Sequence, residues 1–139
     1  MFLLIIGAAC ALCSLAAAVT LHQSLPGWKM VAGLAGVAAD RVANIDVRRL
    51  RRRLSLVFYF IFAGFFALSI LLSVKVLPSV AATLCFFAVA LAAFNAVIVL
   101  YRRFDRNVYS QGVRRSSLIA AIVGNAVLLA LSAISFFLS

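Results

Sequence analysis

The sequence predicts an all-α integral membrane protein, a bundle of four membrane-spanning helices. Hydrophobic residues make up 67% of the chain and charged residues only 12%. Soluble domains are usually about half apolar and about a quarter charged. Four apolar stretches also reach the roughly 20 residues that a helix needs to cross a bilayer core of about 30 Å. The length of 139 residues suits one domain, so we expect residues 1–139 to form a single transmembrane domain.

The first helix is predicted over residues 2–21, which contain no charged side chain. No basic segment precedes its apolar run, and the run exceeds the roughly 7–15 residues of a signal peptide. We therefore expect a retained membrane helix rather than a cleaved leader. Small residues recur along it every three or four positions, which would let a neighbouring helix approach closely. They are Gly7, Ala11, Ser14 and Ala18.

The second helix is predicted over residues 54–74. Asp46 has the side chain of a helix N-cap, so we expect the helix to run through the preceding arginines into the span. Its aromatic residues surround Gly64. These large side chains could face lipid and pack within the bundle. The alternative is a docking face for another membrane-inserted protein, because aromatic side chains anchor interfaces. The candidates for that face are Phe58, Tyr59, Phe62, Phe65 and Phe66.

The third and fourth helices are predicted over residues 78–101 and 117–138. Pro78 separates the third from the second, because proline cannot continue the helical ladder. Asn95 lies about 9 Å and Asn125 about 12 Å from the same end of their helices. Since the two amides would lie at a similar depth in the membrane, we expect them to hydrogen-bond across the helices. The alternative is that they line a polar cavity.

The basic residues predict the topology. Residues 22–53 hold seven Lys and Arg, the turn between the second and third helices holds only Lys75, and residues 102–116 hold five. Cytoplasmic connections carry such an excess. We therefore expect residues 22–53 and 102–116 to be cytoplasmic, and both termini to lie on the outer, periplasmic side. Asp105 is expected to be a local charge partner of the arginines around it.

These connections also predict contact with anionic lipid headgroups, where each cation contributes about 1 kcal/mol. The candidate residues are Arg48, Arg49, Arg51, Arg52, Arg53, Arg102, Arg103, Arg106, Arg114 and Arg115. Residues 30–39 are apolar but too short to span. We expect them to lie at the interface or to pack on the bundle, and Gly27, Gly33 and Gly36 argue against a regular helix at this point. The predicted fold includes a cytoplasmic or interfacial helical segment somewhere between the first two spans.

A short motif in the first connection carries a family resemblance. Val31-Ala32-Gly33 is followed by Ala43, by Asp46 and by Arg48-Arg49-Leu50, and the apolar run comes directly after. This order resembles the domain-of-unknown-function 3784 family of small bacterial multi-span membrane proteins. Leu34-Ala35 stands where that family has Tyr-Asn. The resemblance implies the same architecture in a bacterial membrane, and it implies no chemistry.

The composition argues against several function classes. No predicted span has an ionisable residue at its centre, unlike the spans of ion-coupled carriers. Three acidic residues and one histidine leave little for acid–base catalysis. Cys10 and Cys13 form a C-x-x-C, which we interpret as small packed residues. We therefore expect no enzyme, cofactor or metal site. The hydrophobicity also argues against nucleic acid as a partner in spite of the net charge of +10.

We therefore expect a non-catalytic protein of the bacterial inner membrane that binds another membrane-inserted protein. One form of this hypothesis is an immunity protein that neutralises a membrane-depolarising toxin. The alternatives are a small oligomeric transporter or channel, a holin-like lesion former and an assembly subunit of a membrane complex. Toxin protection, solute flux, toxicity on overexpression and a stable larger complex would distinguish them.

Overall fold

The computed structural model describes residues 2–137. Its helices are α1 (Phe2–Gln23), α2 (Trp28–Val31), α3 (Ala39–Ala43), α4 (Val47–Ser73), α5 (Ser79–Phe104) and α6 (Gln111–Phe137). Four of them, α1, α4, α5 and α6, are long and apolar enough to cross a membrane. Within residues 2–137 the only β-type pairing is an isolated bridge between Ile45 and Asp105. The predicted all-α architecture with four membrane helices is confirmed.

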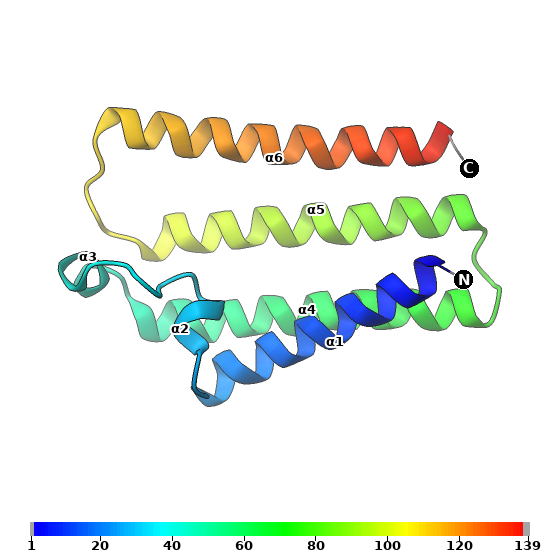
Figure 1. Ribbon diagram of the computed structural model, residues 1–139, viewed down its shortest axis with the longest axis horizontal. Coiled ribbons are helices and arrows are strands. Elements are labelled where there is room, and N and C mark those ends of the chain that lie inside the picture. The colour runs from blue at the N-terminus through cyan, green and yellow to red at the C-terminus, as the bar shows by residue number, and fades with distance from the viewer. Residues whose placement is uncertain (1, 138–139) are drawn as a thin grey trace.

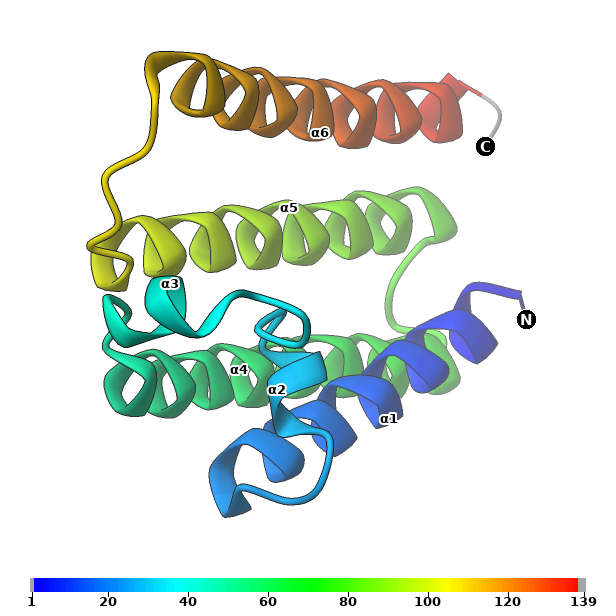
Figure 2. The same ribbon diagram turned by 60° about the vertical axis from the view of Figure 1, so that its left-hand side comes forward.

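The four long helices lie in the order α1, α4, α5, α6, and each packs on its neighbours in this order (Figure 1). The view turned by 60° also places α6 at one edge of this arrangement (Figure 2). Burial falls along the same order. Five residues of α4 are buried, only Ala82 and Thr83 of α5, and none of the described residues of α6. Packing is therefore dense between α1 and α4 and thin at α6.

Small side chains form the contact between α1 and α4. The buried residues Gly7, Ala11, Ser14 and Ala18 lie on this face of α1. A Cβ atom on Gly7 would lie 2.9 Å from the hydroxyl oxygen of Ser69 on α4. The predicted small-residue face is therefore the one that packs, since small residues let two backbones approach closely.

The start of α4 follows the prediction from Asp46. The Asp46 carboxylate accepts a hydrogen bond from the Arg49 backbone N–H at 3.2 Å, which satisfies a donor that the first helical turn leaves free. The helix runs from there through the arginines, and Leu50 and Leu54 are each only 1% exposed. One face of this turn therefore packs on the protein while the arginines project outward.

The basic connections are shorter than predicted. Residues 102–104 continue α5 and residues 111–116 begin α6, so only residues 105–110 connect the two helices. The prediction that residues 102–116 form a connection is wrong in this respect, because hydropathy marks the apolar span and not the end of the helix. Residue 138, the predicted end of the fourth helix, lies outside the described residues.

The segment between α1 and α4 packs on the bundle through two residues. Ala32 and Leu34 are buried in one cluster with Leu21 and Leu54. The Tyr101 hydroxyl donates a hydrogen bond to the Ala32 carbonyl. Most of the remaining residues from 30 to 39 are exposed. The centre of this segment therefore packs on the bundle, and its placement at the membrane interface stays a prediction.

Candidate functional site

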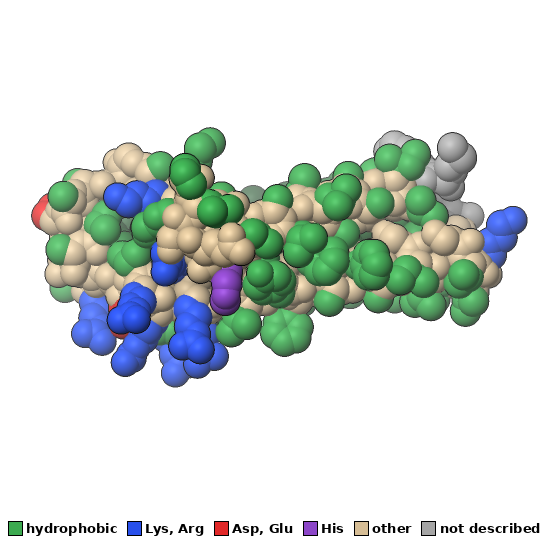
Figure 3. Space-filling model, turned by 90° about the horizontal axis from the view of Figure 1, so that it is seen from below, with side chains coloured by type: hydrophobic (Ala, Val, Ile, Leu, Met, Phe, Trp, Pro, Cys, Tyr) green, Lys and Arg blue, Asp and Glu red, His purple; other side chains and the backbone are tan. Residues whose placement is uncertain are grey.

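The structure gathers the basic residues at one end of the helices, except for Lys75 in the turn between α4 and α5. The space-filling view shows Lys and Arg side chains clustered at this end (Figure 3). The predicted lipid-contacting arginines lie on the first turns of α4 (Arg48, Arg49, Arg51, Arg52, Arg53), at the end of α5 (Arg102, Arg103), in the connection (Arg106) and at the start of α6 (Arg114, Arg115). Both described chain ends, residues 2 and 137, lie at the opposite end of the layer (Figure 1). We call the arginine-rich end the basic end.

The arginines of the basic end differ in their partners. Arg49 pairs with Asp46, with 3.4 Å between Nε and the carboxylate oxygen. Arg51 lies over the ring of Trp28, 5.4 Å from its centroid, and donates a hydrogen bond to Ser24. The guanidinium groups of Arg53 and Arg103 have no hydrogen-bonding or ionic partner among residues 2–137. These two cations are therefore free to meet a ligand.

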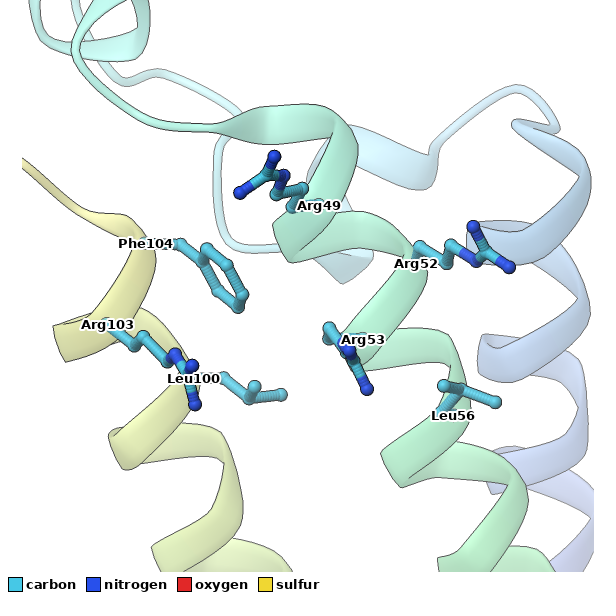
Figure 4. A pocket seen from close by; sticks show the side chains of 7 residues that line it. All are labelled: Arg49, Arg52, Arg53, Leu56, Leu100, Arg103 and Phe104. Atoms are coloured by element: carbon cyan, nitrogen blue, oxygen red, sulfur yellow. The ribbon is translucent and has the colours of Figure 1, made fainter.

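A groove of about 620 Å³ opens between α4 and α5 at the basic end (Figure 4). It is lined by Arg49, Arg52, Arg53, Leu56, Leu100, Arg103 and Phe104. Figure 4 shows Arg53, Arg103 and Leu100 directed toward the space between the two helices. Arg52 and Leu56 lie on the other side of α4 and form the outer edge of the groove.

A hydrogen-bonded cluster holds the two basic connections together. The Asp46 N–H donates to the Phe104 carbonyl and the Arg106 N–H donates to the Asn44 carbonyl, both at 3.2 Å. The Asn107 amide group donates to the Arg41 carbonyl at 2.9 Å. Segments about 60 residues apart in the chain are thereby joined by backbone and amide hydrogen bonds.

Asp105 is the centre of this cluster. Its carboxylate accepts hydrogen bonds from the Tyr109 hydroxyl at 2.5 Å and from the Asn107 side chain at 2.6 Å. The prediction that it pairs with its arginine neighbours is wrong, because the turn after α5 directs it toward Asn107 and Tyr109 instead. Burial acts to raise the pKa of Asp105, but these hydrogen bonds and the charge of Arg41 outweigh it and lower that pKa. The hydrogen bond to Asp105 raises the pKa of Tyr109.

Asn95 and Asn125 lie face to face between α5 and α6. The Asn95 amide group donates to the Asn125 oxygen at 2.7 Å, and the Asn125 amide group donates back at 3.1 Å. Each amide group also donates to a carbonyl one turn earlier in its own helix, Leu91 at 2.8 Å and Ala121 at 2.9 Å. Both N–H bonds of each amide are therefore used within the protein.

The neighbours of the two asparagines complete this contact. A Cβ atom on Gly124 would lie only 2.5 Å from the Cζ atom of Phe94. The ring of Phe94 thus occupies the space that the glycine leaves open. The sequence indicates the two amides, and Gly124 as a small residue that allows close approach, but it gives no sign that the ring of Phe94 would fill this space.

The aromatic residues of α4 do not share one surface. Phe65 is buried and packs against Phe86 of α5, with 5.1 Å between ring centroids. Phe58 packs against the buried cluster around Leu54. Tyr59 meets His22 of α1 edge to face. Phe62 and Phe66 stack on each other at 5.4 Å, and Phe66 is half exposed. Only part of the candidate docking face is therefore open.

Comparison with known proteins gives no further guide. No family, curated protein or solved structure matches the chain. Among residues 2–137, no three His, Cys, Asp or Glu side chains lie close enough together to hold a metal ion. Two features of the structure remain as candidate sites. One is the basic end, and the other is the exposed side of α6, which has no buried residue among those described.

Proposed function

We propose that the protein is a non-catalytic membrane protein that binds a transmembrane helix of another protein along α6. The observation that carries this proposal is that none of the described residues of α6 is buried, although the helix is 27 residues long. Its half-buried residues between positions 121 and 137 form one stripe at helical spacing, which includes Gly124 and Asn125, and the other sides of this part of the helix are exposed. A helix held on one side only leaves a wide face for a second helix.

The open face of α6 also has a shape that favours helix packing. Ala126, Ala130 and Ala133 follow each other at intervals of four and three residues, and all three are exposed. Apolar area alone does not drive helices together in lipid, because the acyl chains are equally apolar. Close approach across small residues does favour association. These alanines therefore mark the side of α6 on which we expect the partner.

The proposal includes the location and the class of partner. We place the basic end in the cytoplasm of a bacterium and both termini outside its inner membrane, because Lys and Arg concentrate in cytoplasmic connections. With a membrane-depolarising toxin as partner, the protein would act as an immunity protein that holds the toxin helix inactive.

Site-specific photo-crosslinking in cells tests this proposal. A photoreactive residue at Ala130 should join the protein to a different membrane protein, whereas one at Ser73, an exposed position at the end of α4, should not. Ala126→Leu with Ala130→Leu should abolish a cross-link formed from Ala133. Val127→Ile with Leu131→Ile, which alters a neighbouring face of α6, should leave it intact. A cross-link only between two copies of this chain would contradict a heterologous partner.

The toxin form of the proposal has its own readout. Expression should preserve the membrane potential of cells exposed to the cross-linked partner, and the double leucine variant should lose this protection. A partner that does not depolarise membranes would remove the immunity role and leave the binding role. The oligomeric transporter is not favoured. The side-chain N–H groups of Asn95 and Asn125 donate hydrogen bonds to each other and to the backbone, so they are not available to line a solute path.

A further inference from the structure

We propose that the groove between α4 and α5 at the basic end is a binding site for one anionic phospholipid. In this site Arg53 and Arg103 bind the phosphate group, and an acyl chain lies against the apolar residues on the membrane side. The inference concerns a different surface from the α6 face and does not depend on the proposed partner protein. It assigns particular residues to a lipid contact that net charge predicts only for the basic end as a whole.

The charge of the groove is the first argument. Four of its seven lining residues are arginines, and no acidic residue lines it. Asp46 pairs with Arg49, and Arg53 and Arg103 have no counter-ion among residues 2–137. Guanidinium groups fork around phosphate oxygens and form charge-assisted hydrogen bonds with them. An anion between the two helices would satisfy both cations at once.

The position of the apolar lining residues is the second argument. Leu100 precedes Arg103 by one helical turn on α5, and Leu56 follows Arg53 by one turn on α4. Since the two helices are antiparallel, both leucines lie on the side of the arginines that faces the apolar spans. Leu100 is the leucine directed into the space between the helices, and Leu56 lies at the outer edge of the groove, where it is 43% exposed. Over about one helical turn, the lining of the groove thus changes from guanidinium groups to apolar side chains.

This order of charge and hydrocarbon selects the occupant. A free phosphate or a soluble phosphate ester would use the arginines and leave the leucines exposed. A phospholipid places its phosphate and its acyl chains at these two levels in the same order. Basic pockets between membrane helices bind anionic lipid headgroups in this way.

Native mass spectrometry of the full chain in detergent tests the site. Phosphatidylglycerol should bind about tenfold or more tightly than phosphatidylcholine with the same acyl chains, because only the former keeps a net negative charge beside the arginines. Glycerol 3-phosphate, which has the phosphate without the chains, should fail to displace it. Equal binding of the two lipids, or displacement by glycerol 3-phosphate, would contradict a phospholipid site.

Paired variants separate the groove from the general charge of the basic end. Arg53→Gln with Arg103→Gln should weaken phosphatidylglycerol binding by about tenfold or more. Arg48→Gln with Arg115→Gln removes the same charge outside the groove and should change binding little. All four side chains are exposed, so far-UV circular dichroism should show unchanged helix content. An equal loss in the two variants would show that the lipid is held by the surface charge and not by this groove.

Discussion

Asn95 and Asn125 show what single residues contribute to this structure. Their reciprocal hydrogen bonds lie in the part of the molecule with the least burial. In lipid an unpaired amide has no water to bond with. We therefore expect these two residues to determine how firmly α6 is held to α5.

A double-mutant cycle measures this contribution. Asn95→Leu and Asn125→Leu should each destabilise the contact, and the double variant should lose less than the sum of the two. The expected coupling is about 0.6–1.7 kcal/mol, the range for such hydrogen bonds in membrane proteins. Unfolding by sodium dodecyl sulfate in bicelles provides the free energies. Additive losses would mean that the two amides do not depend on each other.

Gly124 provides a second test of the same contact. Gly124→Ala places a methyl group against the Phe94 ring, so the ring or α6 must move, at about 1–3 kcal/mol. Gly112→Ala is the matched control, because a Cβ atom there meets nothing within 4 Å. The control should unfold at the same detergent concentration as the parent or a higher one. Equal stability of the two variants would contradict the close approach of Phe94.

Asp105 makes the basic end sensitive to acid. Its folded-state pKa is lowered below the ordinary value of 3.8. Its contribution to stability is therefore present above pH 3.8 and is lost as pH falls through the lower, folded value. Tyr109→Phe removes a hydrogen bond to the charged form and should raise the pKa of Asp105 toward 3.8. Carbon-13 NMR titration of the labelled carboxyl group measures this shift.

The matched control for that titration is Tyr59→Phe, since Tyr59 meets His22 on α1 and not Asp105. It should leave the titration of Asp105 unchanged. If Tyr109→Phe also left the pKa of Asp105 in place, the hydroxyl hydrogen bond would not be the cause of the shift.

At the scale of the element, the face of α1 that packs could be predicted from sequence. The spacing of Gly7, Ala11, Ser14 and Ala18 indicates one side of a helix, and that side is buried. The aromatic residues of α4 gave no such answer, because bulky apolar side chains suit both a buried contact and lipid. Phe65 is buried and lies against Phe86 of α5, a contact that its residue type does not reveal.

A larger side chain on the packed face should separate α1 from α4. Ala18 is fully buried, so Ala18→Leu should overpack the contact and destabilise the protein by about 1–3 kcal/mol. Ala16→Leu adds the same atoms at an exposed position of the same helix and should have little effect. The detergent-unfolding midpoint distinguishes them. Similar midpoints for both variants would contradict the assigned packing face of α1.

At the scale of the whole molecule, the four helices and the basic end followed from hydropathy and charge counting. Which helices pack against each other could not be predicted in this way. Antiparallel helices of similar length can close into a ring or lie in a row, and the apolar pattern is the same when lipid and protein are both apolar. The bond between Asn95 and Asn125 joins α5 to α6, yet nothing in the sequence excludes a contact between α6 and α1. The hydrogen-bonded cluster around Asp105 was missed for a related reason. Arg41 and Asn44, which bond to Arg106 and Asn107 in this cluster, are distant from them in the chain.

The central claim is that four helices cross the membrane with the basic end in the cytoplasm. Cysteine labelling tests it most directly, after Cys10, Cys13 and Cys85 have been replaced by alanine. Val76 in the α4–α5 turn is 68% exposed and Val108 in the α5–α6 connection is 91% exposed. A membrane-impermeant maleimide added to intact cells should label Val76→Cys but label Val108→Cys only after lysis. Labelling of Val108→Cys in intact cells, with Val76→Cys protected, would contradict the topology and the position of the lipid groove.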